Sequence, residues 1–215
     1  MWIHLVKKDF LLVRKYWIVM LIGAVALPVW IRTRTDFIAG GFLSFAISTL
    51  YIQYLLFNAV SLIEFKYKGS ALLCATPYTR KATVLAKYAF LAAVYVGCCL
   101  VYTLTALLLP GRIEMLRLSD IALSLLIASA IFGVLIPVQY RFGYDRSKLF
   151  FFFLLFLLPF VLPAILKWWQ NREVALPIAL MHSQTLQAGL LGLLAIAIGW
   201  LSARISVGIY SARNL

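Results

Sequence analysis

The sequence has few charged residues and few cysteines, and each shortage excludes a class of protein. Only 13% of the 215 residues are charged, whereas 64% are hydrophobic, and the mean hydropathy is +0.97. A soluble domain of this size cannot bury so much apolar surface, and a disordered chain has the opposite composition. Three cysteines, of which Cys98 and Cys99 are adjacent, do not make a disulfide framework. The solvent for most of this chain is therefore a lipid bilayer.

Motifs for catalysis and for nucleotide binding are also missing from the sequence. There is no HExxH zinc motif, and the only histidines, His4 and His182, lie far apart. The chain has no GxxxxGK[S/T] phosphate-binding motif and no recognisable nucleophile–base pair. We therefore expect no metal, no cofactor and no enzymatic activity in this chain itself.

Six stretches contain no Asp, Glu, Lys, Arg or His, and each is near the roughly 20 residues that cross a bilayer. They are residues 16–31, 37–63, 88–109, 121–138, 149–166 and 186–203. They lack the alternation of a membrane barrel, so backbone hydrogen bonding in lipid requires helices. We predict an all-α integral membrane protein with six transmembrane helices in a single domain over residues 1–215. The uncharged spans argue against an ion-coupled carrier and against an intramembrane protease.

Residues 1–15 are predicted to form an amphipathic helix that lies in the membrane interface. Two groups of side chains fall on opposite sides of such a helix. The basic side carries His4, Lys7, Lys8, Arg14 and Lys15, and the apolar side carries Trp2, Leu5, Val6, Phe10, Val13 and Trp17. Asp9 and Leu11 break this pattern. The alternative is a first span that simply begins early.

The distribution of basic residues predicts the orientation in the membrane. One side of the six spans carries 14 of the 20 Lys and Arg residues, and the other side carries 6. Because basic loops stay in the cytoplasm, and because an even number of spans returns the chain to its starting side, both termini are predicted to be cytoplasmic. The net charge of +13 indicates contact with anionic lipids. No basic stretch forms a domain of its own, so nucleic-acid binding is not expected.

Uncharged polar side chains recur along one face of the second predicted span, at steps of three and four residues. They are Ser44, Ser48, Tyr51, Tyr54, Asn58 and Ser61. Hydrogen bonding between helices explains such a face, and so does one wall of a translocation path. The sixth span has Ala195, Gly199 and Ala203 at steps of four, a spacing that permits close helix contact within a subunit or between subunits.

Two cytoplasmic segments, residues 64–87 and 139–148, are candidates for binding a partner. In the first, Leu72 and Leu73 offer a short apolar surface between Gly69 and Pro77. That surface suits docking into a groove of a partner protein, although the leucines could instead fold back onto the lipid interface. In the second, Gly143 lies between two aromatic residues and predicts a tight, exposed turn.

The two segments resemble the signature of permease subunits in a bacterial family of type-2 ABC exporters. Matching residues in the first are Glu64, Lys68, Gly69, Leu72, Leu73, Pro77, Arg80, Lys87 and Tyr88. Matching residues in the second are Pro137, Phe142, Gly143, Tyr144, Asp145, Arg146 and Lys148. Thr76 stands where the family has leucine. Within the family, the sequence is most similar to exporters of phenol-soluble modulins and related antimicrobial peptides.

The resemblance implies a permease of the bacterial plasma membrane that carries amphipathic peptides outward. Two permease copies, expected to be identical, would work with two copies of a separate ABC ATPase that binds ATP and Mg. The residues implied in ATPase coupling are Glu64, Lys68, Gly69, Leu72, Leu73, Thr76, Pro77, Arg80, Phe142, Gly143, Tyr144 and Asp145. An alternative is a membrane anchor that recruits a cytosolic partner without transport. An enzyme acting on lipid is disfavoured because no acids, His or Cys cluster at the interface.

Overall fold

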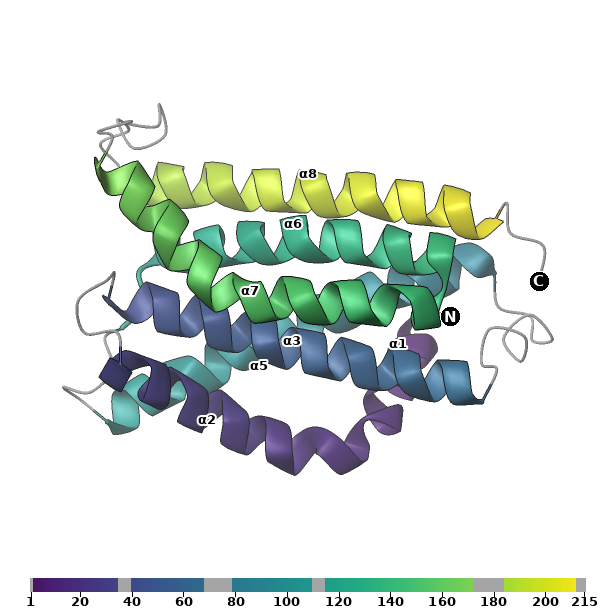
Figure 1. The fold of residues 1–215 in the computed structure, drawn as a ribbon, viewed down its shortest axis with the longest axis horizontal. Helices are drawn as coiled ribbons and strands as arrows, with labels where there is room; N and C mark the ends of the chain where they lie inside the picture. The colour runs from purple at the N-terminus through teal and green to yellow at the C-terminus, as the bar shows by residue number, and fades with distance from the viewer. Residues whose placement is uncertain (1, 35–39, 68–78, 110–114, 172–183, 212–215) are drawn as a thin grey trace.

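The computed structural model describes residues 2–34, 40–67, 79–109, 115–171 and 184–211. Nearly all of these residues are helical, and no strand occurs among them. In chain order the elements are α1 (Trp2–Leu12), the short 3-10 helix η1 (Arg14–Tyr16), α2 (Trp17–Arg34), α3 (Gly40–Lys66), α5 (Arg80–Leu108), α6 (Leu118–Phe142), α7 (Tyr144–Asn171) and α8 (Gln184–Ser211). Figure 1 shows the long helices side by side in one bundle, so the predicted all-α architecture is confirmed.

Each charge-free stretch of the sequence coincides largely with one long helix. Five helices, all except α1 and α7, have the length and apolar composition of a membrane span. The assignment of α7 as the sixth span stays a prediction. The helices also extend beyond the predicted stretches: α3 continues to Lys66 and α5 begins at Arg80. The segment 64–87 is therefore helical at both ends, and its residues 68–78 lie outside the described part of the chain.

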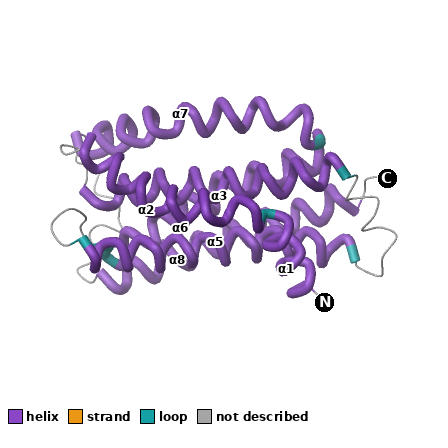
Figure 2. Tube along the Cα trace, turned by 90° about the horizontal axis from the view of Figure 1, so that it is seen from below, coloured by secondary structure: helices purple, strands orange, loops and turns teal. Residues whose placement is uncertain are grey.

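Helix α3 forms the centre of the bundle. In its most apolar stretch 67% of the residues are buried, compared with 17% in the span that contains α2. Large side chains from three helices, among them Phe57, Phe90 and Phe132, pack into the main core. Figure 2 shows α7 along one side of the bundle and α5 and α8 along the other. This position of α3 explains why its polar side chains are mostly enclosed by protein.

Helix α1 packs against protein as well as carrying an exposed basic side. Leu5, Asp9 and Val13 form one buried stripe at steps of four residues, with relative exposures of 3%, 2% and 0%. This stripe faces α5 and, to a lesser extent, α3. The ring of Phe10 lies 4.9 Å from that of Phe90 on α5. The two residues that broke the amphipathic pattern are thereby explained, because Asp9 is buried and Leu11 is exposed. The location of α1 at a membrane surface stays a prediction.

Candidate functional site

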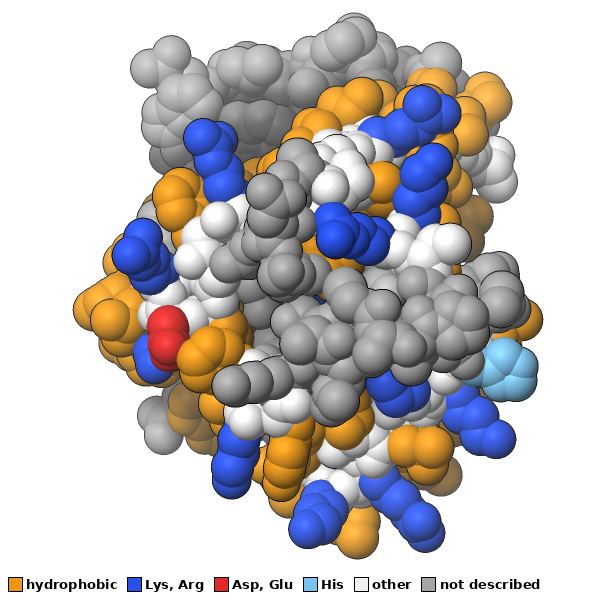
Figure 3. Space-filling model, turned by 90° about the vertical axis from the view of Figure 1, so that its right-hand side faces the viewer, with side chains coloured by type: hydrophobic (Ala, Val, Ile, Leu, Met, Phe, Trp, Pro, Cys, Tyr) orange, Lys and Arg blue, Asp and Glu red, His pale blue; other side chains and the backbone are white. Residues whose placement is uncertain are grey.

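One end of the bundle brings together those predicted coupling residues that lie in the described part of the chain. Helices α3 and α8 end there, α5 begins there, and α6 turns into α7 there (Figure 1). Figure 3 faces this end and shows described Lys and Arg side chains spread around it, with little exposed acid. We call it the basic end. It is the side of the molecule for which the sequence predicts a cytoplasmic location.

A cluster of four charged side chains ties three helices together at the basic end. Glu64 on α3 is its centre: Lys8 Nζ on α1 lies 2.8 Å from one carboxylate oxygen and Lys87 Nζ on α5 lies 2.5 Å from the other. Lys8 Nζ is also 3.1 Å from Asp9 Oδ1. Asp9 and Lys87 are buried, at 2% and 6% exposure. Ion pairs this well enclosed are screened little by salt, and loss of one partner is expensive.

The environment of the cluster shifts the pKa values of its two α1 residues. Burial raises the pKa of the Asp9 carboxyl above its usual value, and the nearby Lys87 and Lys8 offset only part of this effect. For Lys8, burial acts against the charged form, but the carboxylates of Glu64 and Asp9 outweigh it and raise the pKa of its ammonium. Lys8 is therefore held as a cation, whereas Asp9 carries its charge at a cost.

The junction between α6 and α7 is a single residue, Gly143. Its φ of 83° and ψ of 169° lie in a region of backbone conformation that is essentially restricted to glycine. The Gly143 N–H donates to the carbonyl of Gln139, and its own carbonyl accepts a bond of 2.7 Å from Ser147 Oγ. The predicted tight turn is confirmed, and glycine is required there because the backbone reverses in one residue.

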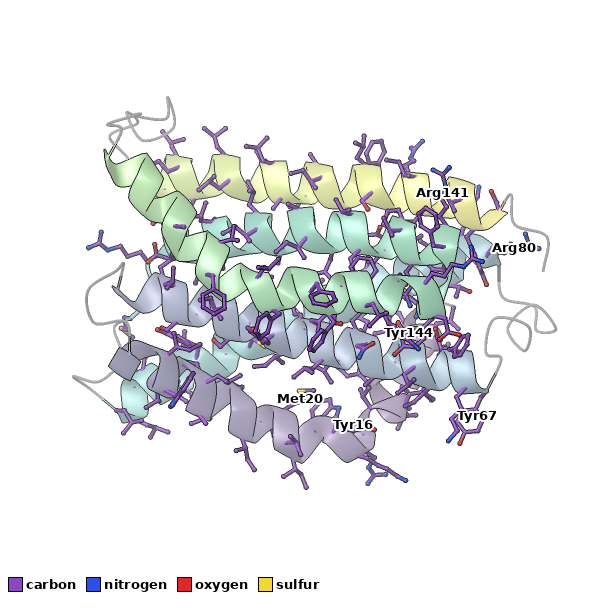
Figure 4. All side chains as sticks on the ribbon, viewed as in Figure 1. Tyr16, Met20, Tyr67, Arg80, Arg141 and Tyr144 are labelled. Carbon is purple, nitrogen blue, oxygen red and sulfur yellow. The ribbon has the colours of Figure 1, made fainter. Side chains whose placement is uncertain are left out.

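The start of α7 is attached to the last turns of α3. The Tyr144 hydroxyl donates to Asn58 Oδ1 over 3.0 Å, and its ring lies 5.5 Å from that of Phe65. Figure 4 shows Tyr144 and Tyr67 at this corner of the bundle. Asp145, by contrast, pairs with Lys148 in an exposed contact of 2.8 Å, and Phe142 is 53% exposed. Phe142 and Asp145 are thus the predicted coupling residues that face outward at this junction.

Arg80 connects the start of α5 to the end of α8. Its Nη1 donates to the carbonyl of Ser211 over 2.9 Å and to that of Tyr210 over 3.4 Å. The last carbonyls of a helix lack intrahelical partners, so a cation there satisfies them and interacts favourably with the helix dipole. Thr79 caps the other helix by accepting from the Ala82 N–H. Arg80 therefore has a structural task at the place where a coupling role is predicted.

Half of the predicted coupling residues are not located by the structure. Lys68, Gly69, Leu72, Leu73, Thr76 and Pro77 lie outside the described residues. The structure does describe the two helices on either side of this segment. The preceding helix ends close to Glu64, the following helix begins at Arg80, and the ion pair from Glu64 to Lys87 joins the two.

The polar face of α3 is enclosed within the single chain. Ser44 Oγ donates to the Gly41 carbonyl over 2.9 Å, and Ser48 Oγ donates to the Ser44 carbonyl over 2.6 Å. Both bonds lie within α3. They therefore do not connect two helices, which was one of the two predicted explanations of the polar face. Asn58 does join helices, through Tyr144. Tyr54 and Ser61 are buried and Tyr51 is partly buried. Their role as the wall of a translocation path stays a prediction.

Sequence reasoning missed the roles of Lys8, Asp9 and Lys87 as a group. Asp9 was the one feature of the sequence that could have indicated this cluster, because an acid on the apolar side of an amphipathic helix needs a partner. Lys87 was noted only as part of a motif, and its pairing with Glu64 depends on how α3 and α5 pack. Among the described residues no three His, Cys, Asp or Glu side chains lie close enough to hold a metal ion. The cluster offers ion pairing between three helices.

Comparison with known proteins identifies the family. The family model described as ABC-2 family transporter protein matches residues 4–211, which is nearly the whole chain. No curated protein and no solved structure gives a match. The match includes every described helix apart from the first two residues of α1. The chain therefore belongs to the ABC-2 family of membrane transporter proteins.

Proposed function

We propose that this chain, the membrane permease component of an ABC transporter, exports amphipathic peptides and is driven at its basic end by a separate ATPase. Membership of the family implies the partner ATPase. The peptide substrate, the homodimeric permease and the 2+2 complex are parts of the proposal. So are the ATP and Mg in the partner, the bacterial plasma membrane and the cytoplasmic position of both termini.

One observation carries the coupling part of the proposal: the helix ends that flank segment 68–78 are joined rigidly to their neighbours. Glu64 links α3 to α5 and α1 through two lysines. Tyr144 links the α6–α7 junction to α3. A push on either cytoplasmic segment would therefore reach at least four helices through partly buried polar contacts. Rigid-body movement of this kind is how a permease can convert closure of an ATPase into opening of a path.

The charge distribution supports an amphipathic cargo. The long helices carry their ionisable groups near their ends, and the six charge-free stretches leave the middle of the membrane apolar. An apolar passage opposes small ions but tolerates the apolar face of a peptide. The basic end would attract anionic lipids and hold the permease with that face in the cytoplasm.

The coupling role is tested by replacing the apolar pair in segment 68–78. The variant Leu72→Asp/Leu73→Asp should keep the permease folded and abolish peptide-stimulated ATP hydrolysis by the co-purified ATPase, with loss of export. The control Ser70→Asp/Ala75→Asp adds the same charge to the same segment and keeps both leucines. The assay uses the complex in vesicles with labelled amphipathic peptide. Unchanged export by the leucine variant would remove the pair from coupling.

The same assay separates transport from anchoring. A membrane anchor would move no peptide in the unaltered complex or in either variant. An exporter moves peptide in the control and stops in the leucine variant.

A further inference from the structure

An apolar groove of about 530 Å³ lies between α5 and α8, with α6 as its floor. This volume is within the usual range of ligand sites. Leu85 and Ala89 line one wall, Ile196 and Trp200 line the other, and Ala128 and Phe132 lie between them. The groove is separate from the polar face of α3 and from the charge cluster.

Hydrogen bonds beside the groove attach α8 to α6 and α5. Near the basic end, Ser202 Oγ donates to the Gly133 carbonyl on α6 over 2.6 Å, and the Tyr88 hydroxyl lies 2.6 Å from Ser202 Oγ. These contacts bring three helices together at the bottom of the groove. Above them, a Cβ placed on Gly199 would meet nothing within 4 Å. There is therefore open space beside Gly199 that a larger side chain could occupy.

The groove extends over about half of the membrane. Its lining reaches from Leu85 to Tyr95 on α5 and from Ala195 to Ala203 on α8. At 1.5 Å of rise per residue these stretches cover about 12–15 Å. The hydrocarbon core of a bilayer is about 30 Å thick, so the groove is about as long as one leaflet. Its start lies at the basic end.

Each wall of the groove leads to a cation at the basic end. Lys81 precedes Leu85 by one turn on the same side of α5 and is exposed. Arg204 follows Trp200 by one turn on α8 and is exposed, with its guanidinium 4.3 Å from the centre of the indole ring. The start of α5 and the end of α8 meet through Arg80 and Ser211. The two cations thus flank the polar end of an apolar, one-leaflet groove.

We propose that this groove binds one acyl chain of an anionic phospholipid, with the phosphate held between Lys81 and Arg204. The length, apolar lining and paired cations match the tail and the head of such a lipid. The groove lining includes no acidic residue to neutralise the cations.

The test uses the full chain in lipid nanodiscs and the fluorescence of Trp200. The contribution of Trp200 is obtained by subtracting the fluorescence of the Trp200→Phe variant from that of the unaltered protein. The probe is brominated phosphatidylglycerol in an excess of phosphatidylcholine, compared with brominated phosphatidylcholine at the same fraction. The proposal predicts stronger quenching by the phosphatidylglycerol probe. Each cation is expected to favour binding of phosphatidylglycerol over phosphatidylcholine about fivefold. This ratio of affinities corresponds to about 1 kcal/mol.

Two pairs of variants make the assignment specific. Gly199→Leu should fill the groove and abolish the preference, whereas Gly189→Leu, on the same helix but outside the groove lining, should keep it. Lys81→Gln and Arg204→Gln should each lower the preference about fivefold while leaving the groove intact. Arg146→Gln, an exposed cation on α7 at the same end, is the control.

Three results would overturn the proposal. The first is equal quenching by the two lipids in the unaltered protein. The second is an equal loss of preference in Arg146→Gln, since a general surface field would then explain the effect. The third is efficient disulfide cross-linking of two chains through Ile196→Cys, which would make the groove an interface between copies.

Discussion

At the scale of single residues, the buried ion pair of Lys87 and Glu64 holds α3 and α5 together beside the coupling segment. Lys87→Met keeps the length of the side chain but leaves one carboxylate oxygen of Glu64 without its ammonium partner. We expect the free energy of unfolding to fall by about 2 kcal/mol, because Glu64 loses one of its two ammonium partners and keeps only Lys8. Thermal or denaturant unfolding in detergent measures this.

The control for that prediction is Lys148→Met, which breaks an exposed pair with Asp145. Exposed pairs contribute about 0–1 kcal/mol, so stability should hardly change. Equal effects of the two variants would show that Lys87 does not form the enclosed pair described here.

The ionised carboxylate of Asp9 is predicted to lower the stability of the folded protein at neutral pH. Burial raises the pKa of Asp9 in the folded protein. Its contribution to stability is therefore fully present below the unfolded pKa of about 3.9 and is lost as pH rises through the folded pKa. Asp9→Asn removes this loss, so the variant should be at least as stable as the unaltered protein at neutral pH.

The measurement is the melting temperature of both proteins from pH 4 to pH 8. The advantage of Asp9→Asn should grow as the pH rises and level off above the folded pKa. An advantage that shrinks with rising pH would mean that the Asp9 carboxylate is stabilised by its lysine neighbours.

At the scale of helices, the sequence predicted well which segments are helical. It predicted poorly which side chains contact one another. The charge-free stretches locate the long helices because apolar runs in lipid must satisfy their own backbone groups. The break at Gly143 was also predictable from local chemistry. The burial of Asp9 was not, because an amphipathic pattern places every charge outside. Similarly, the steps of Ser44 and Ser48 cannot distinguish bonds between helices from bonds to their own backbone.

The one-residue junction of α6 and α7 makes a prediction at this scale. Gly143→Ala should destabilise the protein by about 1–3 kcal/mol, because alanine is strained at the observed φ and ψ. Export should fall as Tyr144 loses its position on α3. Melting temperature and peptide uptake into vesicles measure the two effects.

Gly97→Ala, in the middle of α5, is the matched control for the junction. A Cβ at Gly97 meets nothing within 4 Å, and alanine favours a helix by about 1 kcal/mol over glycine. It should be neutral or stabilising. If Gly143→Ala were equally harmless, the junction would not depend on the backbone freedom of glycine.

At the scale of the whole molecule, several described polar contacts lie at one end of the bundle. The basic end holds the charge cluster, the α6–α7 junction and the ends of α3 and α8, and the ends of the described chain also lie there (Figures 1 and 3). Family membership gives the permease role, and the arrangement of charges gives a reason for a separate motor. The sequence could predict the uneven distribution of basic residues because it is a matter of counting charges. It could not predict the lipid-sized groove, which arises from the packing of α8 on α6.

We propose that this chain moves peptide only when a second polypeptide supplies the energy. The direct measurement is uptake of a labelled amphipathic peptide into vesicles that contain the chain alone or the chain with its ATPase. We predict uptake only when the ATPase, ATP and Mg are all present, with none from the chain alone under a proton or sodium gradient. Sustained concentrative uptake by the isolated chain without nucleotide would contradict the account.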